Sequence, residues 1–368
     1  MPACSILERP PPDVMTAPIL LLDIDGTLIE DRGYRRAQVE AARYVCASWG
    51  VPTYTPDEQE INVLHAYGYS NEWDSTAFNV GINLVEAARG NPGRPDFAAW
   101  ARRTAAFDGR PHERARALLL SEAPPHLHAD IHRLLDDVSD PRVSPTTRLL
   151  YLFVLGSRRF EAHFGLNAEL ESPSFLETMD VPIADAQAAQ IIRAHPSSAY
   201  TSRPSLPPDG SRPGLYQTPE AEIALAQLGM TDLPLVGLGA MRWLADVKGG
   251  TTWDYAKPAP LQALAAMLCA TGVPLSDAVL AAHAFVTGGD SRALRALDGR
   301  RVIIIEDNAG GVRGGQRAAA LLKDAGIQIH VTGFGVARDP AKRAALADVC
   351  TALFDDVNAA LAALGGDV

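Results

Sequence analysis

The chain has 368 residues, of which 47% are hydrophobic and 21% charged, so it can bury a sizeable core and is not a disordered chain. Its formal net charge of −11 repels nucleic acid and anionic membrane surfaces, and no Lys- or Arg-rich run offsets that field. No run approaches the roughly 18 apolar residues of a membrane span, and the first residues lack the apolar stretch of a signal peptide. We therefore expect a cytoplasmic protein that binds neither nucleic acid nor membranes.

Four cysteines are widely separated and form no CxxC pair: Cys4, Cys46, Cys269 and Cys350. This spacing argues against a zinc site, and four cysteines in a chain of this length are too few for a disulfide-stapled scaffold. Reduced, mostly buried thiols are the expectation.

Residues 1–16 are expected to be a flexible leader, because clustered prolines and polar residues bury little surface. The apolar run from Pro18 to Leu22 predicts a strand that is buried on both faces. This strand ends abruptly in Asp23-Ile-Asp-Gly-Thr27. The carboxyl ends of parallel strands are where α/β folds place their sites, so these acids are candidate functional residues.

Residues 33–195 have a different texture, with apolar residues at helical spacing and few strand patterns. This block predicts a largely helical domain inserted after the first strand. Gly- and Pro-rich stretches such as Gly90–Pro95 are its expected loops.

Strand–helix alternation returns after residue 196 and predicts an α/β core with a parallel sheet, formed by residues 17–32 together with 196–368. The expected strands are Ser198–Thr201, Leu233–Leu238, Arg301–Glu306 and Ile327–Thr332. The expected helices are Glu220–Leu228, Pro260–Ala270, Gly311–Ala325 and Val357–Leu364.

Asp23 and Asp25 stand two residues apart in an extended segment, so their side chains point the same way and share one small space. One carboxylate can then act as a nucleophile or metal ligand while the other serves as acid and base. Gly26 permits the tight turn that follows. An ordinary turn with exposed acids is the alternative; a calcium loop is excluded because further oxygen ligands do not follow at alternate positions.

The run Leu22-Asp-Ile-Asp-Gly-Thr-Leu28 resembles the first motif of the haloacid dehalogenase-like (HAD) hydrolase superfamily. The second motif of that superfamily is a Ser or Thr that ends a strand. Thr201 in Ala199-Tyr-Thr-Ser-Arg-Pro204 fits this position best, with Ser202 as the alternative, although Ser and Thr at strand ends are also common in plain turns.

A lysine, often followed by proline, forms the third HAD motif, and Lys257-Pro-Ala-Pro260 fits it closely. Lys248, the competitor, lacks the proline context. The fourth motif is an acidic pair that ends a strand, and Glu306 and Asp307 follow three isoleucines. Asn308 stands where serine is frequent in the family, and Gly311 stands where some branches use a further acid.

The resemblance implies a Rossmann-like core of subfamily I with a helical C1-type cap over residues 33–195. It implies that Asp23 is the nucleophile, that Asp25 is the acid and base, and that Thr201 and Lys257 hold phosphoryl oxygens. Mg²⁺ is the implied cofactor, with Asp23, Asp25 (through its carbonyl), Glu306 and Asp307 as ligands. Further substrate contacts are expected from Gly26, Thr27, Ser202, Arg203, Asn71 and Trp73.

A small phosphorylated metabolite is therefore the expected partner, and hydrolysis of its phosphomonoester the expected reaction. A phosphomutase would use the same residues, and a non-catalytic relative would bind a phospho-ligand without turnover. For Asn71 and Trp73, a capped helix start with the indole in the core is the alternative to substrate contact. The substrate's identity and the oligomeric state are left open by the sequence.

Overall fold

The structure is a computed structural model that describes residues 17–91, 93–211 and 213–365. These residues form two compact units. The first, which we call the sheet unit, contains the chain up to Leu28, Ile183–Arg203 and the chain from Met230 onward. The second, the helical unit, contains Ile29–Pro182 and Pro204–Gly229. The expected leader, residues 1–16, lies outside the described residues.

Six parallel strands build the sheet unit, in the order β5-β4-β1-β6-β7-β8, which confirms the predicted α/β fold with a Rossmann-like core. Their bounds are β1 Ile19–Leu22, β4 Ser197–Tyr200, β5 Leu235–Val236, β6 Arg300–Glu306, β7 Ile329–Val336 and β8 Ala352–Phe354. β1 lies in the middle of the sheet, and its four apolar residues are fully buried, as expected for a strand covered on both faces.

Strand register brings the ends of the central strands together. Leu22, the last residue of β1, stands opposite Ala199 of β4 and Ile305 of β6. The residues that follow these positions therefore emerge at one edge of the sheet. This is the edge where parallel α/β sheets collect functional side chains.

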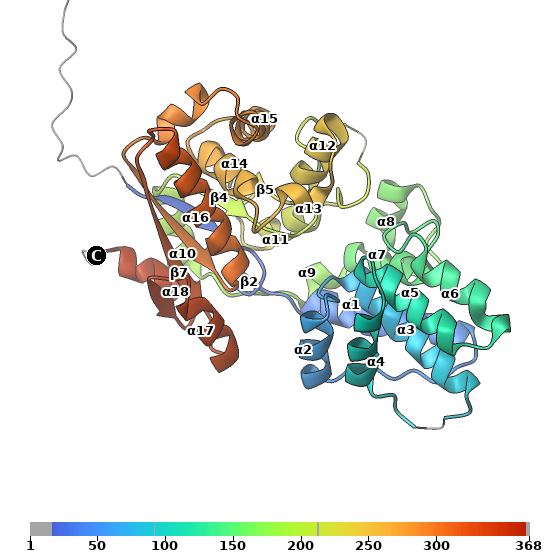
Figure 1. Ribbon diagram of the computed structural model, residues 1–368. Helices are drawn as coiled ribbons and strands as arrows, with labels where there is room; N and C mark the ends of the chain where they lie inside the picture. Colours follow the sequence, from blue (N-terminus) through green and yellow to red (C-terminus); the bar gives the residue numbers. More distant parts are fainter. Residues whose placement is uncertain (1–16, 92, 212, 366–368) are drawn as a thin grey trace, which may run out of the picture. The chain divides into compact units, whose positions relative to one another are not determined.

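Helices flank the sheet within the same unit (Figure 1). α14 packs on β1 and β4, α16 packs on β6 and β7, and the two helices contact each other, while α10 packs against α18. The bounds are α10 Ala186–Ala194, α12 Leu238–Lys248, α13 Thr252–Tyr255, α14 Pro260–Ala270, α15 Leu275–Val286, α16 Ala309–Asp324, α17 Pro340–Ala347 and α18 Val357–Ala362, with 3-10 turns at Arg292–Leu297 and Ala363–Gly365.

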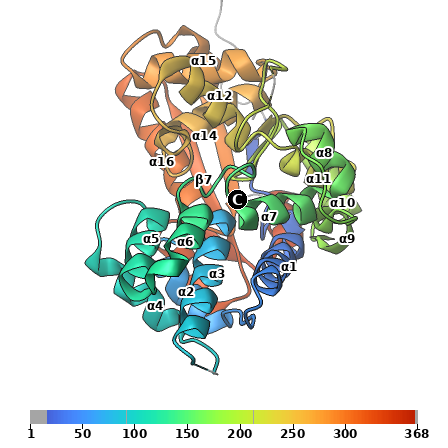
Figure 2. The same ribbon diagram turned by 90° about the vertical axis from the view of Figure 1, so that its right-hand side faces the viewer.

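The helical unit is built around α3, which contacts α1, α4, α5, α6 and α7, as Figure 2 shows for several of these helices. Its bounds are α1 Arg32–Ser48, α2 Glu58–Ala66, α3 Glu72–Ala88, α4 Phe97–Arg103, α5 Pro111–Glu122, α6 His128–Leu135, α7 Pro145–Leu155, α8 Ser157–Phe164, α9 Phe175–Met179 and α11 Glu220–Gln227. 3-10 turns cover Thr104–Ala106 and Pro125–Leu127, and a short antiparallel pair joins β2 Ile29–Glu30 to β3 Val181–Pro182.

Three segments belong to the unit other than the one that the sequence predicted. Residues 29–32, expected in the core, belong to the helical unit. Residues 183–195, expected in the helical insert, belong to the sheet unit, where α10 packs on α18. Pro204–Gly229, expected in the core, belongs to the helical unit. A buried contact holds this last segment in the helical unit: Tyr34 of α1 donates its hydroxyl to the fully buried Glu220 of α11.

Within the described residues, no helix combines the length and the apolar character that crossing a bilayer requires. Cys46 and Cys269 are buried free thiols, and Cys350 is a partly buried one.

Candidate active site

Asp23 and Glu306 meet at the edge of the sheet. Asp23 follows the last residue of β1, and its backbone N–H donates to the carbonyl of Ile305 at 3.1 Å. Glu306 ends the neighbouring strand β6 and is fully buried, while Asp23 is only 7% exposed. Two carboxylates buried this close together are costly unless a cation compensates them.

Lys257 supplies one such cation. Its ammonium donates to Oδ1 of Asp23 at 2.9 Å and to Oε1 of Glu306 at 2.5 Å. It also lies 4.5 Å from the centre of the Tyr200 ring, on the strand that precedes Thr201. The structure therefore joins three of the predicted site residues through one side chain, whereas Lys248 is exposed at the end of α12.

Neighbouring charges shift the pKa values of Lys257 and Glu306. Burial by itself would lower the pKa of Lys257, but the carboxylates of Asp23 and Glu306 outweigh burial and hold that pKa well above its ordinary value. Burial and then the charge of Asp23 raise the pKa of the Glu306 carboxyl well above its usual range, against the opposing effect of Lys257. The site thus has more negative charge than a single lysine balances.

Asp307 completes a cluster of three carboxylates with Asp23 and Glu306. One oxygen from each of these side chains lies within 4.8 Å of the other two. Lys342 of α17 donates to Oδ2 of Asp307, and burial raises the pKa of Asp307 while Lys342 lowers it. Three converging carboxylates with oxygen ligands alone are the donor set that a hard divalent cation prefers.

Two glycines make room for this acidic cluster. Gly26 has a φ of +69°, and a Cβ at this position would lie 2.3 Å from Oδ2 of Asp307. In the first turn of α16, a Cβ on Gly311 would lie 1.7 Å from Oε1 of Glu306. A larger residue at either position would push a cluster carboxylate out of place.

Asp25 is held by an arginine rather than by the acidic cluster. Arg203, with a side chain that is only 1% exposed, donates through Nε at 2.7 Å and through Nη2 at 2.6 Å to Oδ1 of Asp25. The Asp25 side chain remains 32% exposed. Its carboxylate is thus oriented by a buried guanidinium while part of it stays open to a reacting group.

Thr201 directly follows β4 and is fully buried, whereas its neighbour Ser202 is exposed. The Thr201 hydroxyl oxygen accepts the backbone N–H of Arg203 at 3.1 Å. Its hydrogen is therefore left to donate elsewhere. Thr27, another expected contact, is fully buried, and its hydroxyl has no hydrogen-bond partner among the described residues.

Gln262 is a site component that sequence reasoning missed. This fully buried residue of α14 accepts the backbone N–H of Lys257 at 3.0 Å. Its amide group donates to the carbonyl of Thr201 at 2.7 Å and to that of Val236 at 2.9 Å. One side chain therefore ties the loop of Lys257 to the ends of β4 and β5. The signal in the sequence is a single amide in an otherwise apolar helix, because a buried amide must find partners.

Asn71 and Trp73 belong to the helical unit. Asn71 is the N-cap of α3, where its side chain accepts the backbone N–H of Asp74 at 2.8 Å. Trp73 is 6% exposed and packs edge-on against the Tyr216 ring, with a centroid distance of 5.2 Å. This geometry is that of a capped helix start with the indole in the core.

No protein-family model matches this chain. No curated protein sequence matches it either. Among solved structures, it is similar to Northeast Structural Genomics Consortium target ZR25, with a TM-score of 0.60 and 13% sequence identity over 95% of this chain and 98% of that chain. Phosphatase Tt82 from Thermococcus thioreducens matches with a TM-score of 0.47 and 16% identity over 95% of this chain and all of that chain. The similarity to target ZR25 supports the fold alone.

Proposed function

We propose that this chain is a Mg²⁺-dependent phosphatase of the HAD type, which hydrolyses a small phosphomonoester through an aspartyl-phosphate on Asp23. The observation that carries the proposal is the acidic cluster of Asp23, Glu306 and Asp307, with Lys257 bridging the first two at the ends of adjacent parallel strands. A structural salt-bridge network would not need three converging carboxylates of which two are buried.

The donor set fits Mg²⁺. The acidic cluster offers oxygen ligands from three side chains, and the HAD resemblance adds the backbone carbonyl of Asp25. Mg²⁺ accepts such ligands while keeping several waters. When bound, the ion would neutralise charge on the phosphoryl group.

Each step of the proposed reaction has a residue for it. The Asp23 carboxylate attacks phosphorus, the bond from phosphorus to the ester oxygen breaks, and Asp25 gives its proton to the leaving oxygen. Asp25 then takes a proton from water, whose oxygen attacks phosphorus, and the acyl–phosphate bond breaks to release inorganic phosphate. Lys257 and the Thr201 hydroxyl hold phosphoryl oxygens, and Arg203 keeps Asp25 oriented throughout.

The test is phosphate release from a panel of phosphorylated metabolites and an aryl phosphate, with Mg²⁺ and with a chelator. We expect Mg²⁺-dependent release that the Asp23→Asn variant abolishes and that the Asp25→Asn variant reduces on the order of 10²–10⁴-fold. Near-normal release by the Asp23→Asn protein would contradict the assignment.

Labelled substrate separates the proposed function from its two rivals. With a ³²P-labelled panel hit, acid quenching should leave label on the protein that hydroxylamine removes and that Asp23→Asn lacks. A requirement for a bisphosphate activator would identify a phosphomutase instead. Tight binding of a panel compound without release or label would identify a non-catalytic relative.

A further inference from the structure

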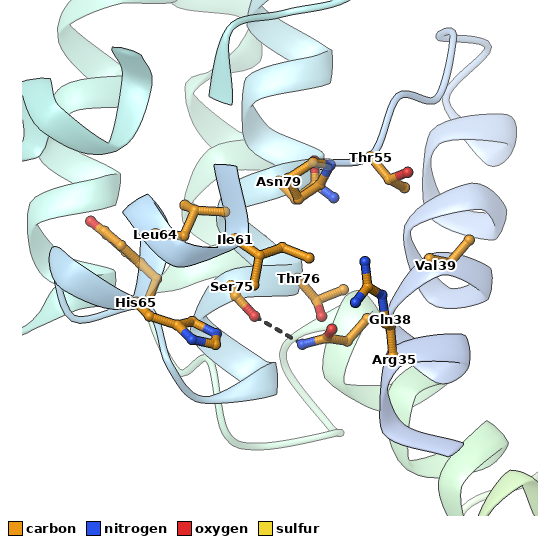
Figure 3. A pocket seen from close by; sticks show the side chains of 12 residues that line it. Arg35, Gln38, Val39, Thr55, Ile61, Leu64, His65, Ser75, Thr76 and Asn79 are labelled. Carbon is orange, nitrogen blue, oxygen red and sulfur yellow. Dashed lines mark hydrogen bonds between the residues drawn. The ribbon is translucent and has the colours of Figure 1, made fainter. Parts of the chain in front are cut away.

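The helical unit contains a hollow with a cavity volume of about 60 Å³ between α1, α2 and α3 (Figure 3). A volume of this order holds a few water molecules or a small polar molecule, and it is too small for a peptide or a lipid chain. None of the residues that define the proposed reaction lines it. The lining residues are Arg35, Gln38, Val39, Thr55, Pro56, Ile61, Leu64, His65, Tyr69, Ser75, Thr76 and Asn79.

The lining has an unusual charge for this protein. It includes a guanidinium and an imidazole together with hydroxyl and amide groups, and none of the described lining residues has a carboxylate. The chain as a whole carries a net charge of −11. Because its described lining lacks acidic side chains, the pocket presents hydrogen-bond donors and positive charge to an occupant, although the protein as a whole is acidic.

Arg35 differs from the other arginines of α1. Arg36 and Arg43 both pair with Glu40, and Arg32 pairs with Glu30. Arg35 has no ion-pair or hydrogen-bond partner among the described residues, and position 39, one helical turn on, is a valine. Figure 3 shows its guanidinium extending from α1 toward α3. Its planar set of N–H donors is therefore available for an anionic group.

A second, independent observation lies on the opposite wall. Thr76 of α3 is only 2% exposed, and its hydroxyl has no hydrogen-bond partner among the described residues. Beside it, Gln38 donates to the Ser75 hydroxyl at 3.0 Å, which bridges α1 and α3 at the floor of the hollow (Figure 3). A buried hydroxyl that faces a hollow without a partner is costly, and a bound oxygen or nitrogen atom would satisfy it.

We propose that this hollow binds a small organic anion, with its carboxylate or phosphate on Arg35 and a polar atom on the Thr76 hydroxyl. The apolar residues Val39, Ile61 and Leu64 would face its carbon skeleton. This inference does not depend on the proposed phosphatase activity, because none of the catalytic residues lines the hollow.

Calorimetric titration of the full chain with succinate and with inorganic phosphate tests this site. Asp23→Asn protein with a chelator present removes turnover and metal from the measurement. Succinate tests a carboxylate and phosphate tests a phosphoryl group, while tetramethylammonium provides a cation control. We expect at least one anion to bind and tetramethylammonium not to bind.

Arg35→Met should weaken that binding roughly tenfold or more, as expected for the loss of a charge-assisted contact. Arg36→Met, the neighbouring and already paired arginine, should change it less than about twofold. Thr76→Val should also weaken it, with the circular dichroism spectrum unchanged. The proposal is overturned if neither anion binds, if Arg36→Met matches Arg35→Met, or if binding survives Arg35→Met but is lost in Lys257→Ala.

Discussion

Replacing Gln262 with methionine tests whether this side chain holds the active-site loops in place. Methionine keeps the length and most of the volume but removes all three hydrogen bonds. The backbone N–H of Lys257 and the carbonyl of Thr201 would then lack partners, whereas the carbonyl of Val236 would keep the N–H of Thr201 at 3.2 Å. Each such group costs about 1–3 kcal/mol, so the low end of that range for two groups gives about 2 kcal/mol of lost stability.

The effect on turnover should exceed the effect on substrate binding. If the loop of Lys257 shifts by about 1 Å, the phosphoryl group loses its alignment, which costs on the order of 10²-fold in kcat. Gln262→Glu should behave like the methionine variant, because its acceptor oxygens would face the two carbonyls that the amide now donates to.

Urea unfolding monitored by circular dichroism gives the stability, and phosphate release on the best panel compound gives kcat and KM. Gln316→Met is the matched control, because Gln316 is exposed and makes a single bond to the carbonyl of Val349. The control should stay within about 0.5 kcal/mol of the parent chain. The reasoning is refuted if Gln262→Met is as stable and as active as Gln316→Met.

Lys257→Ala removes the cation between two buried carboxylates, so we expect loss of phosphate release and a loss of about 3–5 kcal/mol of stability. Lys248 is exposed, and Lys248→Ala should change neither quantity. Equal effects of the two substitutions would contradict the third-motif assignment. Gly26→Ala brings a Cβ to 2.3 Å from a cluster carboxylate, so calorimetry should find Mg²⁺ binding at least roughly tenfold weaker, and unchanged binding would argue against the proposed metal site. Burial raises the pKa of Cys46 to about 11 and that of Cys269 to about 12. Iodoacetamide at pH 8 should therefore label both thiols in urea and neither in the folded chain, as read by mass spectrometry; labelling of the folded chain would contradict their burial.

The parts of the site that the sequence predicted share one local pattern, an apolar strand that ends in polar residues. Asp23 and Glu306 follow runs of Leu and Ile, and a fully apolar strand is recognisable without knowing its neighbours. The parallel order of the strands follows from their alternation with helices, and it brings the two acids to one edge. Recognising such a strand end needs only a short segment of sequence, so both Asp23 and Glu306 could be predicted.

Two side-chain pairings between distant segments were not predicted. Asp25 and Arg203 lie 178 positions apart in the chain, and nothing in the sequence around either residue indicates that they pair. The same holds for Tyr34 and Glu220, whose contact places α11 in the helical unit. Side-chain pairing across the fold depends on three-dimensional packing, which periodicity in one sequence does not encode.

The helix that covers Glu306 has a low intrinsic helix propensity, and its glycines let it pack close to the sheet. α16 contains Gly310, Gly311, Gly314 and Gly315, and a Cβ at 315 would lie 1.9 Å from the side chain of Ile304. Four glycines cost roughly 3–4 kcal/mol of helix propensity relative to alanine. A peptide with the sequence of α16 should therefore be a random coil in water. In the folded chain, the helix behind the acidic cluster therefore owes its stability to packing against β6 and β7.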